Sequence, residues 1–129
     1  MDAPIAWLLE LAVKPGQLDT FRALMEEMVA STLAEPGALS YEWFISDDAG
    51  VVHLYERYAD SAATVAHLGT FGEWFAGRFL SAVDPTRFTV MGSPSDEAKS
   101  ALSAFGPTFL CLLGGFVREA DARAAVSRG

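Results

Sequence analysis

The chain lacks the cysteine pairs that form the stabilising disulfides of many secreted proteins. Its 129 residues include one cysteine, two histidines and no asparagine. A single cysteine cannot form an internal disulfide, and Cys111 stands in the apolar run from Phe109 to Leu113. That setting is typical of a small buried residue rather than of a reactive thiolate. We therefore expect a reducing compartment, the cytoplasm.

Positive charge is also scarce. Nine Lys and Arg side chains against seventeen Asp and Glu give a net charge of −8, and such a field repels phosphate backbones and anionic lipid headgroups. The longest apolar stretch, Phe109 to Val117, is far shorter than the ~20 residues that span a bilayer. No basic segment precedes the apolar run Ile5 to Leu9, so a secretory signal is not expected. We expect no nucleic-acid partner and no membrane anchor.

Motifs for common cofactors and nucleophiles are missing as well. The sequence has no serine-hydrolase elbow, no phosphate-binding loop and no glycine fingerprint between a strand and a helix. His53 and Glu56 stand three residues apart on one expected strand, which sends them to opposite faces and argues against a zinc site. His53 is expected at the surface or in an interface. The sequence therefore predicts neither a cofactor nor a metal.

Apolar residues in regular patterns are abundant instead. Hydrophobic residues make up 51% of the chain and charged residues 20%, which favours one folded core with apolar surface left for a subunit contact. Periodicity and turn formers predict a strand over 5–13, a helix over 18–32, strands over 39–46 and 51–58, a helix from 60 to about 83 interrupted near Gly69 and Gly72, and a strand over 87–91.

This order, β-α-β-β-α-β, predicts an α+β domain of ferredoxin-like type, in which an antiparallel four-stranded sheet carries both helices on one face. Residues 1–92 form this module. Residues 93–129 form a C-terminal extension of the same domain, with a helix capped by Ser95 and running to Phe105, and a strand over 108–113. A second copy of the chain is the expected cover for the bare sheet face.

The loop between the two central strands fixes their register. Four residues separate Ser46 from Val51, so Tyr41 is expected opposite Glu56. The face expected under the helices then carries Leu39, Tyr41, Trp43, Ile45, Val52, Leu54, Glu56 and Tyr58. The opposite face carries Ser40, Glu42, Phe44, His53, Tyr55 and Arg57. Glu56 is the single carboxylate in an apolar layer and needs a partner there, and His67 is the only imidazole of the following helix.

Two interpretations of this pair remain open. In one, Glu56 and His67 are catalytic and work as an acid/base pair inside an aromatic cavity. The substrate-binding residues are then Tyr41, Trp43, Tyr58, Phe71 and Trp74. In the other interpretation, the pair is a structural hydrogen bond between helix and sheet, and the aromatic residues are ordinary core.

Three segments resemble the antibiotic biosynthesis monooxygenase family. They are Glu35-Pro36-Gly37-Ala38-Leu39-Ser40-Tyr41, then Leu54-Tyr55-Glu56-Arg57-Tyr58-Ala59-Asp60-Ser61-Ala62, then Ala66-His67-Leu68. The family pattern is an acid-Pro-Gly turn into a strand that bears tyrosine, a strand that ends in Glu-x-aromatic, and a helix that bears histidine. The resemblance covers roughly residues 5 to 92.

The resemblance implies homodimers that pack their sheets face to face into a barrel, with a pocket between the sheet and the helices of each subunit. Relatives include cofactor-free monooxygenases of quinols or polyketide phenols, haem-degrading monooxygenases, and members without known activity. The haem-degrading branch uses an asparagine, a tryptophan and a histidine. This chain has no asparagine, and Tyr58 stands where that tryptophan is expected, so haem degradation is disfavoured.

The leading hypothesis is therefore a cofactor-independent monooxygenase of a small electron-rich aromatic molecule, with Glu56 or His67 as the base. The alternative is a non-catalytic dimeric domain that binds a lipophilic molecule or has a stress-related role. An aromatic cavity beside His67 large enough for a ring would favour the first hypothesis.

Overall fold

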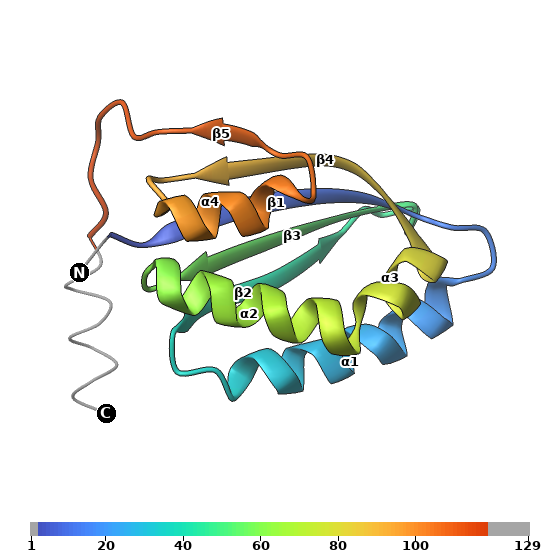
Figure 1. Ribbon diagram of the computed structural model, residues 1–129. Coiled ribbons are helices and arrows are strands. Elements are labelled where there is room, and N and C mark those ends of the chain that lie inside the picture. The colour runs from blue at the N-terminus through green and yellow to red at the C-terminus, as the bar shows by residue number, and fades with distance from the viewer. Residues whose placement is uncertain (1–2, 119–129) are drawn as a thin grey trace.

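A five-stranded sheet with helices on one face forms the part of the chain that the structure describes, residues 3–118 (Figure 1). The elements of this computed structural model are β1 (Ile5–Val13), α1 (Leu18–Leu33), β2 (Ala38–Ile45), β3 (Val51–Tyr58), α2 (Ser61–Trp74), α3 (Ala76–Ala82), β4 (Val83–Met91), α4 (Asp96–Ser103) and β5 (Thr108–Leu110).

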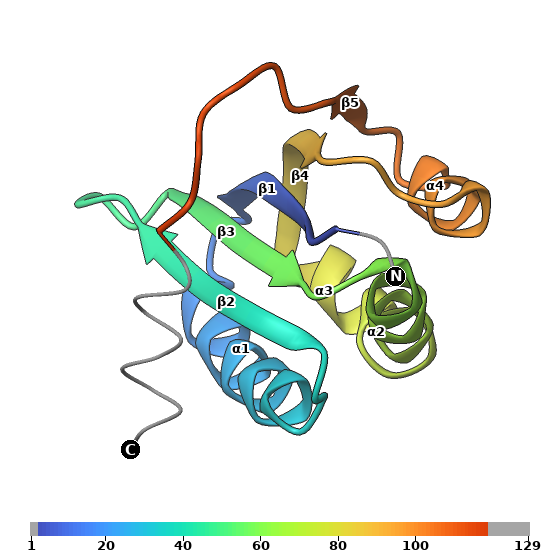
Figure 2. The same cartoon turned by 90° about the vertical axis from the view of Figure 1, so that its left-hand side faces the viewer.

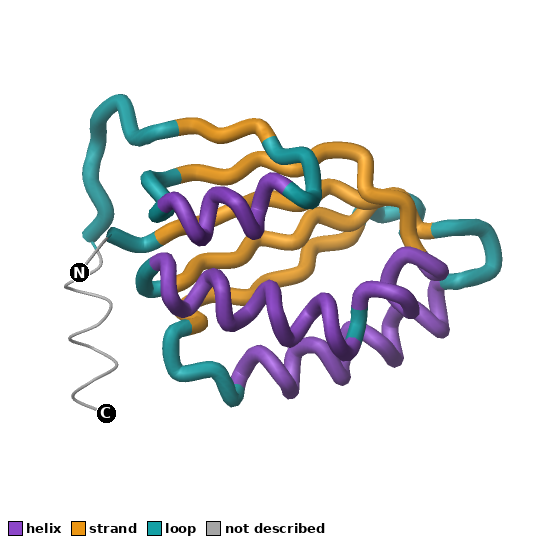
Figure 3. Tube along the Cα trace, viewed as in Figure 1, coloured by secondary structure: helices purple, strands orange, loops and turns teal. Residues whose placement is uncertain are grey.

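The strand order is β2-β3-β1-β4-β5. Neighbouring strands are antiparallel except β4 and β5, which are parallel. Helices α1, α2, α3 and α4 lie on the same side of the sheet (Figures 2 and 3). The predicted α+β, ferredoxin-like arrangement is confirmed, and β5 extends its four antiparallel strands to a mixed sheet.

Helix α1 shows why this arrangement is stable. Its buried residues Phe21, Leu24, Met28 and Thr32 recur at steps of three and four, so that one stripe of the helix faces the sheet. The helix ends at Leu33, just before Glu35 and Pro36, because proline disfavours helical backbone in the residue that precedes it.

The hairpin has the predicted register. Tyr41 lies opposite Glu56 and Trp43 opposite Leu54. A bulge between Ala38 and Ser40 interrupts the pleat at Leu39, and Leu39 is exposed rather than covered by helices as expected. Ile45, the last residue of β2, is exposed as well and does not lie in the core.

The second half of the module differs from expectation at two points. Gly69 and Gly72 lie inside a continuous α2, and the break falls at Phe75, whose φ of −126° is not helical. Strand β4 begins at Val83 and not near Arg87. The register shifts between Glu10 and Leu11, and beyond this bulge β4 continues to pair with β1 as far as Val83. A bulge of this kind tolerates Pro85, which has no N–H to donate.

The C-terminal extension is partly as predicted. Ser95 caps α4, its side chain accepting a hydrogen bond from the Ala98 N–H at 3.2 Å. Strand β5 is shorter than predicted and ends at Leu110. Cys111 therefore lies beyond the sheet and is exposed, so the expectation of a buried cysteine is wrong. Residues 119–129 of the extension lie outside the described residues.

Two core clusters lie between sheet and helices. One includes Phe21, Leu24, Met28 and Phe79, and the other includes Ile5, Trp7, Tyr58, Val90 and Leu102. Within residues 3–118, none of the helices is both long enough and apolar enough to cross a membrane.

The turn between α1 and β2 lies tightly against α2 at Gly37. A Cβ atom at this position would lie 2.5 Å from Cβ of Ala63. We predict that Gly37→Ala lowers the free energy of unfolding by about 1–3 kcal/mol, the usual cost of overpacking. Gly69→Ala is the matched control, because a Cβ there meets nothing within 4 Å, and it should stabilise α2 by up to about 1 kcal/mol. Urea denaturation of both variants measures this, and equal stabilities would contradict the predicted clash.

Candidate active site

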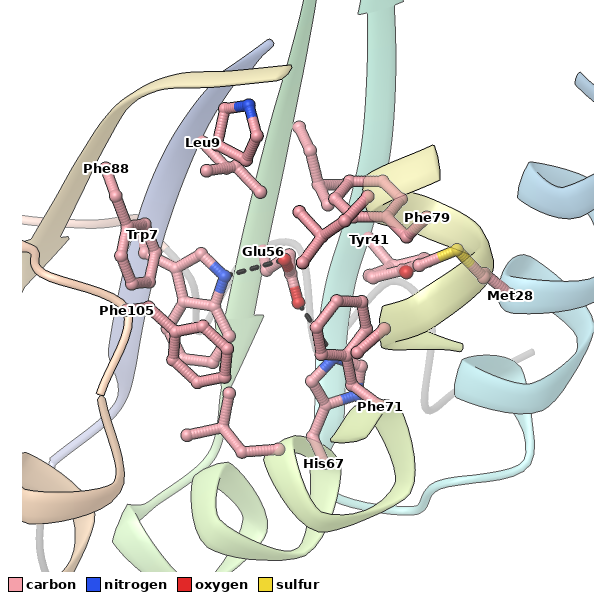
Figure 4. Close-up of a pocket in the computed structure, with 15 residues that line it drawn as sticks. Trp7, Leu9, Met28, Tyr41, Glu56, His67, Phe71, Phe79, Phe88 and Phe105 are labelled. Atoms are coloured by element: carbon pink, nitrogen blue, oxygen red, sulfur yellow. Dashed lines mark hydrogen bonds and ion pairs between the residues drawn. The ribbon is translucent and has the colours of Figure 1, made fainter. Parts of the chain in front are cut away.

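A cavity of about 130 Å³ opens between the sheet and the helices (Figure 4). Its lining joins both core clusters, with Met28 and Phe79 from one and Trp7 from the other. Six of the lining side chains are aromatic, namely Trp7, Tyr41, Phe71, Phe79, Phe88 and Phe105. A dry apolar cavity of ~150 Å³ holds one benzene ring. The cavity is partly open to solvent and therefore has room for one aromatic ring of a ligand.

A buried carboxylate, that of Glu56, lies at the wall of this cavity. Glu56 is 4% exposed because it lies on the covered face of β3, between Leu54 and Tyr58. Its Oε2 accepts a hydrogen bond from the indole N–H of Trp7 at 2.6 Å, and its Oε1 accepts one from the hydroxyl of Tyr58 at 2.6 Å. Trp7 is the residue opposite Glu56 in the β1–β3 pairing, so the strand register places this donor next to the carboxylate.

Oε1 of Glu56 has a further partner, Nε2 of His67, at 3.1 Å. A carboxylate offers about four lone-pair positions. Two of the three donors use Oε1 and one uses Oε2. Among the described residues, one position on Oε2 is therefore without a donor. A ligand hydroxyl in the cavity can donate to it.

His67 lies on α2 and is 6% exposed. While Nε2 faces Glu56, Nδ1 lies 3.1 and 3.2 Å from the two carboxylate oxygens of Glu35. Burial lowers the pKa of His67, but the hydrogen bond and charge of Glu56, followed by those of Glu35, outweigh burial and raise this pKa above its ordinary value. Each ring nitrogen therefore faces a carboxylate, and these contacts favour the protonated form of the ring.

Two tyrosines complete the polar surroundings. Burial, followed by the charge of Glu56, raises the pKa of Tyr41 and of Tyr58 well above the ordinary range. Both phenols therefore stay neutral and can only donate or accept hydrogen bonds. The rings also fix the imidazole, because Tyr58 lies 4.7 Å and Tyr41 5.7 Å from it between centroids.

The structure brings most of the expected site residues together. Glu56, His67, Tyr41 and Phe71 line the cavity. Trp74 does not: it is the last residue of α2 and is 64% exposed, so placing it in the cavity was wrong.

Tyr58 and Trp43 lie behind the cavity wall rather than in it. Tyr58 is a donor to Glu56. Trp43 packs on Phe21 and Phe79 in the core, with its indole N–H buried and unbonded among the described residues.

Several residues at or near the site were not among the site residues expected from the sequence, including Trp7, Glu35, Phe79, Phe88 and Phe105. Trp7 could have been predicted from the sequence, since the ferredoxin-like order places the first strand beside the third. Phe105 was not, because it follows α4 in the extension and packs on Phe71 and Phe88 at 6.1 and 6.4 Å between centroids.

The chain matches known proteins over a region that includes Trp7, Glu56 and His67. A family model described as antibiotic biosynthesis monooxygenase matches residues 4–74. A Mycobacterium tuberculosis protein named "Putative monooxygenase Rv0793" is 34% identical over 70 residues, which cover 54% of this chain and 69% of that protein.

Solved structures share the fold. MupZ from Pseudomonas fluorescens superposes with a TM-score of 0.82 at 22% identity and covers 93% of both chains. SnoaB from Streptomyces nogalater, described as a cofactor-independent oxygenase, superposes with a TM-score of 0.61 at 13% identity and covers 74% of this chain and 96% of its own. Both likenesses concern the fold.

Phe105 is 46% exposed and forms one wall of the cavity. We predict that Phe105→Ala admits a second ring and lowers the Kd of the neutral dye N-phenyl-1-naphthylamine about 10-fold, since ~60 Å² more apolar surface is buried at ~25 cal/mol per Å². Phe116→Ala is the control, because Phe116 is exposed in the same extension and does not line the cavity. Fluorescence titration measures both, and an equal effect of the two changes would remove Phe105 from the cavity wall.

Proposed function

Because the chain belongs to the antibiotic biosynthesis monooxygenase family, we propose that it is a cofactor-independent monooxygenase of a small electron-rich aromatic, a quinol or a polyketide phenol. One observation carries this proposal. An aromatic cavity with room for one ring lies beside a buried carboxylate, and that carboxylate has an unfilled acceptor position. The description of SnoaB as a cofactor-independent oxygenase supports the same chemistry.

The first step is removal of a proton from the substrate. The ring lies between the aromatic walls, and its hydroxyl donates to Oε2 of Glu56, which takes the proton as general base. The resulting aromatic anion forms next to His67, whose protonated form the two carboxylates favour. A positive charge fixed in an apolar cavity stabilises such an anion more than water-exposed charge would.

The second step uses the electrons of that anion. The ring carbon transfers electrons to dioxygen, and a C–O bond forms to give a hydroperoxide. Proton return from Glu56 and loss of water then leave a carbonyl on the ring. One oxygen atom ends in the product and one in water, so dioxygen is the only oxidant. The apolar lining excludes water from the electron-rich anion during this sequence.

The apolar lining also favours a second function. A domain that only holds a lipophilic molecule needs the same cavity, and the Glu56–His67 contact then serves to fix α2 to the sheet. The two functions differ in oxygen use: the binding domain retains its ligand unchanged.

We further propose that the chain acts as a homodimer through the sheet face that no helix of residues 3–118 covers. Phe44 on that face is 56% exposed, and it borders a shallow hollow with Ile45, Val51 and His53. A sheet face left uncovered in a small domain, with an exposed aromatic side chain on it, is typical of a subunit contact. Two such sheets packed together form the barrel expected from the family resemblance.

Oxygen consumption tests the enzymatic function. In metal-free buffer, the protein should speed oxygen uptake by a panel of hydroquinones, naphthoquinols and anthrones, each of which can place one ring in the cavity. Glu56→Gln and His67→Ala should each lower this rate about 10²-fold or more, the scale for loss of a positioned general base. Thermal melting of both variants checks that they remain folded, because unpairing a buried partner costs about 1–3 kcal/mol. Folded variants that retain the parent's rates, or a parent that binds the panel without oxygen uptake, would favour the binding domain.

Sedimentation tests the dimer. The mass in dilute solution should be near twice 13.8 kDa. Phe44→Glu should shift the equilibrium toward monomers, because two carboxylates would meet without water across the symmetry axis. Trp74→Glu is the control, since Trp74 is an equally prominent exposed aromatic at the end of α2, on the helix side. A stable monomer of the unchanged chain would contradict the proposed barrel.

A further inference from the structure

A second carboxylate, that of Glu35, contacts the imidazole from the side away from the cavity. Its oxygens lie 3.1 and 3.2 Å from Nδ1 of His67, whereas Nε2 lies 3.1 Å from Glu56. Glu35 is not among the residues that line the cavity. Its side chain is 20% exposed, compared with 5% for that of Glu56. One imidazole therefore joins a cavity carboxylate to a carboxylate nearer the surface.

We propose that Glu35 is a positioning residue: it holds the His67 ring in the orientation that points Nε2–H at Glu56 and keeps that ring positively charged. The part of this inference that concerns turnover rests on the proposed function. The part that concerns the state of His67 does not. A carboxylate that orients the far nitrogen of a histidine is a recurring device for fixing which ring nitrogen faces the reacting group.

The backbone holds Glu35 in place. Its N–H donates to the carbonyl of Thr32 at 2.9 Å, and its own carbonyl accepts from the N–H of Ala38 at 3.1 Å. The carbonyl of Gly37 accepts from the N–H of Ala59 at 2.9 Å, and Gly37 lies directly against Ala63. The turn is thus fixed both to β3 and to α2, the helix that carries His67. A fixed carboxylate can orient a ring that a flexible surface side chain could not.

The other groups around His67 cannot replace Glu35. Tyr41 on β2 and Tyr58 on β3 face the ring as neutral phenols, and Trp7 on β1 has no ionisable group. Glu56 on β3 is the remaining negative charge, and it also accepts from Trp7 and Tyr58. Loss of Glu35 leaves Nδ1 without its carboxylate acceptor, so the ring can give up that proton or turn.

Proton NMR of the two histidines tests this directly. The chain has only His53 and His67, so a His53→Gln variant assigns both imidazole signals. In Glu35→Gln, the titration midpoint of His67 should fall by about 1 unit or more, the usual effect of removing an adjacent opposite charge. Glu35→Asp, which keeps the charge, should restore much of the shift.

Glu10→Gln is the matched control. Glu10 pairs with His53 at 3.6 Å, so this change should affect only the signal of His53. Equal His67 midpoints in the unchanged chain, in Glu10→Gln and in Glu35→Gln would overturn the proposal.

Two further measurements separate this inference from the proposed function. In the unchanged protein at pH 7, the ¹⁵N shifts of His67 should report protons on both ring nitrogens. An unprotonated ring nitrogen would overturn the proposal even if Glu35→Gln failed to fold.

With a substrate that is oxidised, Glu35→Gln should lower kcat about 10-fold or more with little change in KM, because Glu35 does not touch the cavity. An unchanged kcat would exclude a role in turnover. If no substrate is oxidised, the proposed function fails, while the histidine titrations still decide the role of Glu35.

Discussion

A carboxylate is stable inside an apolar core only when donors replace the water it has lost. Glu56 receives them from three elements: the indole of Trp7 on β1, the hydroxyl of Tyr58 on its own strand and the imidazole of His67 on α2. Each donor depends on a different part of the fold, namely the β1–β3 register, the pleat of β3 and the packing of α2 on the sheet. The cavity lies beside this cluster, and its lining is mostly apolar and includes six aromatic side chains.

The chain around the cluster serves to keep it rigid and dry. The Glu35-Pro36-Gly37 turn ends α1 and brings a second carboxylate to His67. The extension beyond the ferredoxin-like module adds Phe105 to the cavity wall. Strands thus place the carboxylate and two of its donors, helix α2 places the imidazole, and the extension adds an aromatic wall to the cavity. The cluster joins two carboxylates through one imidazole, and a carboxylate at the cavity wall suits a site that accepts a proton from its ligand.

Much of this could be predicted from the sequence where local patterns decide. Helical periodicity predicts α1, and the four-residue loop predicts the hairpin register, which by itself places Glu56 among apolar side chains. Prediction failed where tertiary contacts decide. The bulge at Leu39, the strand that runs through Pro85, and the break at Phe75 rather than at a glycine depend on partners distant in the chain. Trp7 and Phe105 escaped notice for the same reason, since neither lies near His67 in sequence.

The central claim is that the cavity binds an aromatic hydroxyl against Oε2 of Glu56. A crystal structure of the protein soaked with hydroquinone under strict exclusion of oxygen tests it most directly, because the ligand then binds without being consumed. The account predicts one ring among Trp7, Phe71 and Phe88, with its hydroxyl within hydrogen-bond distance of that oxygen, about 2.5–3.0 Å. A ring bound with its hydroxyl turned away from Glu56, or a cavity that stays empty at saturating hydroquinone, would contradict it.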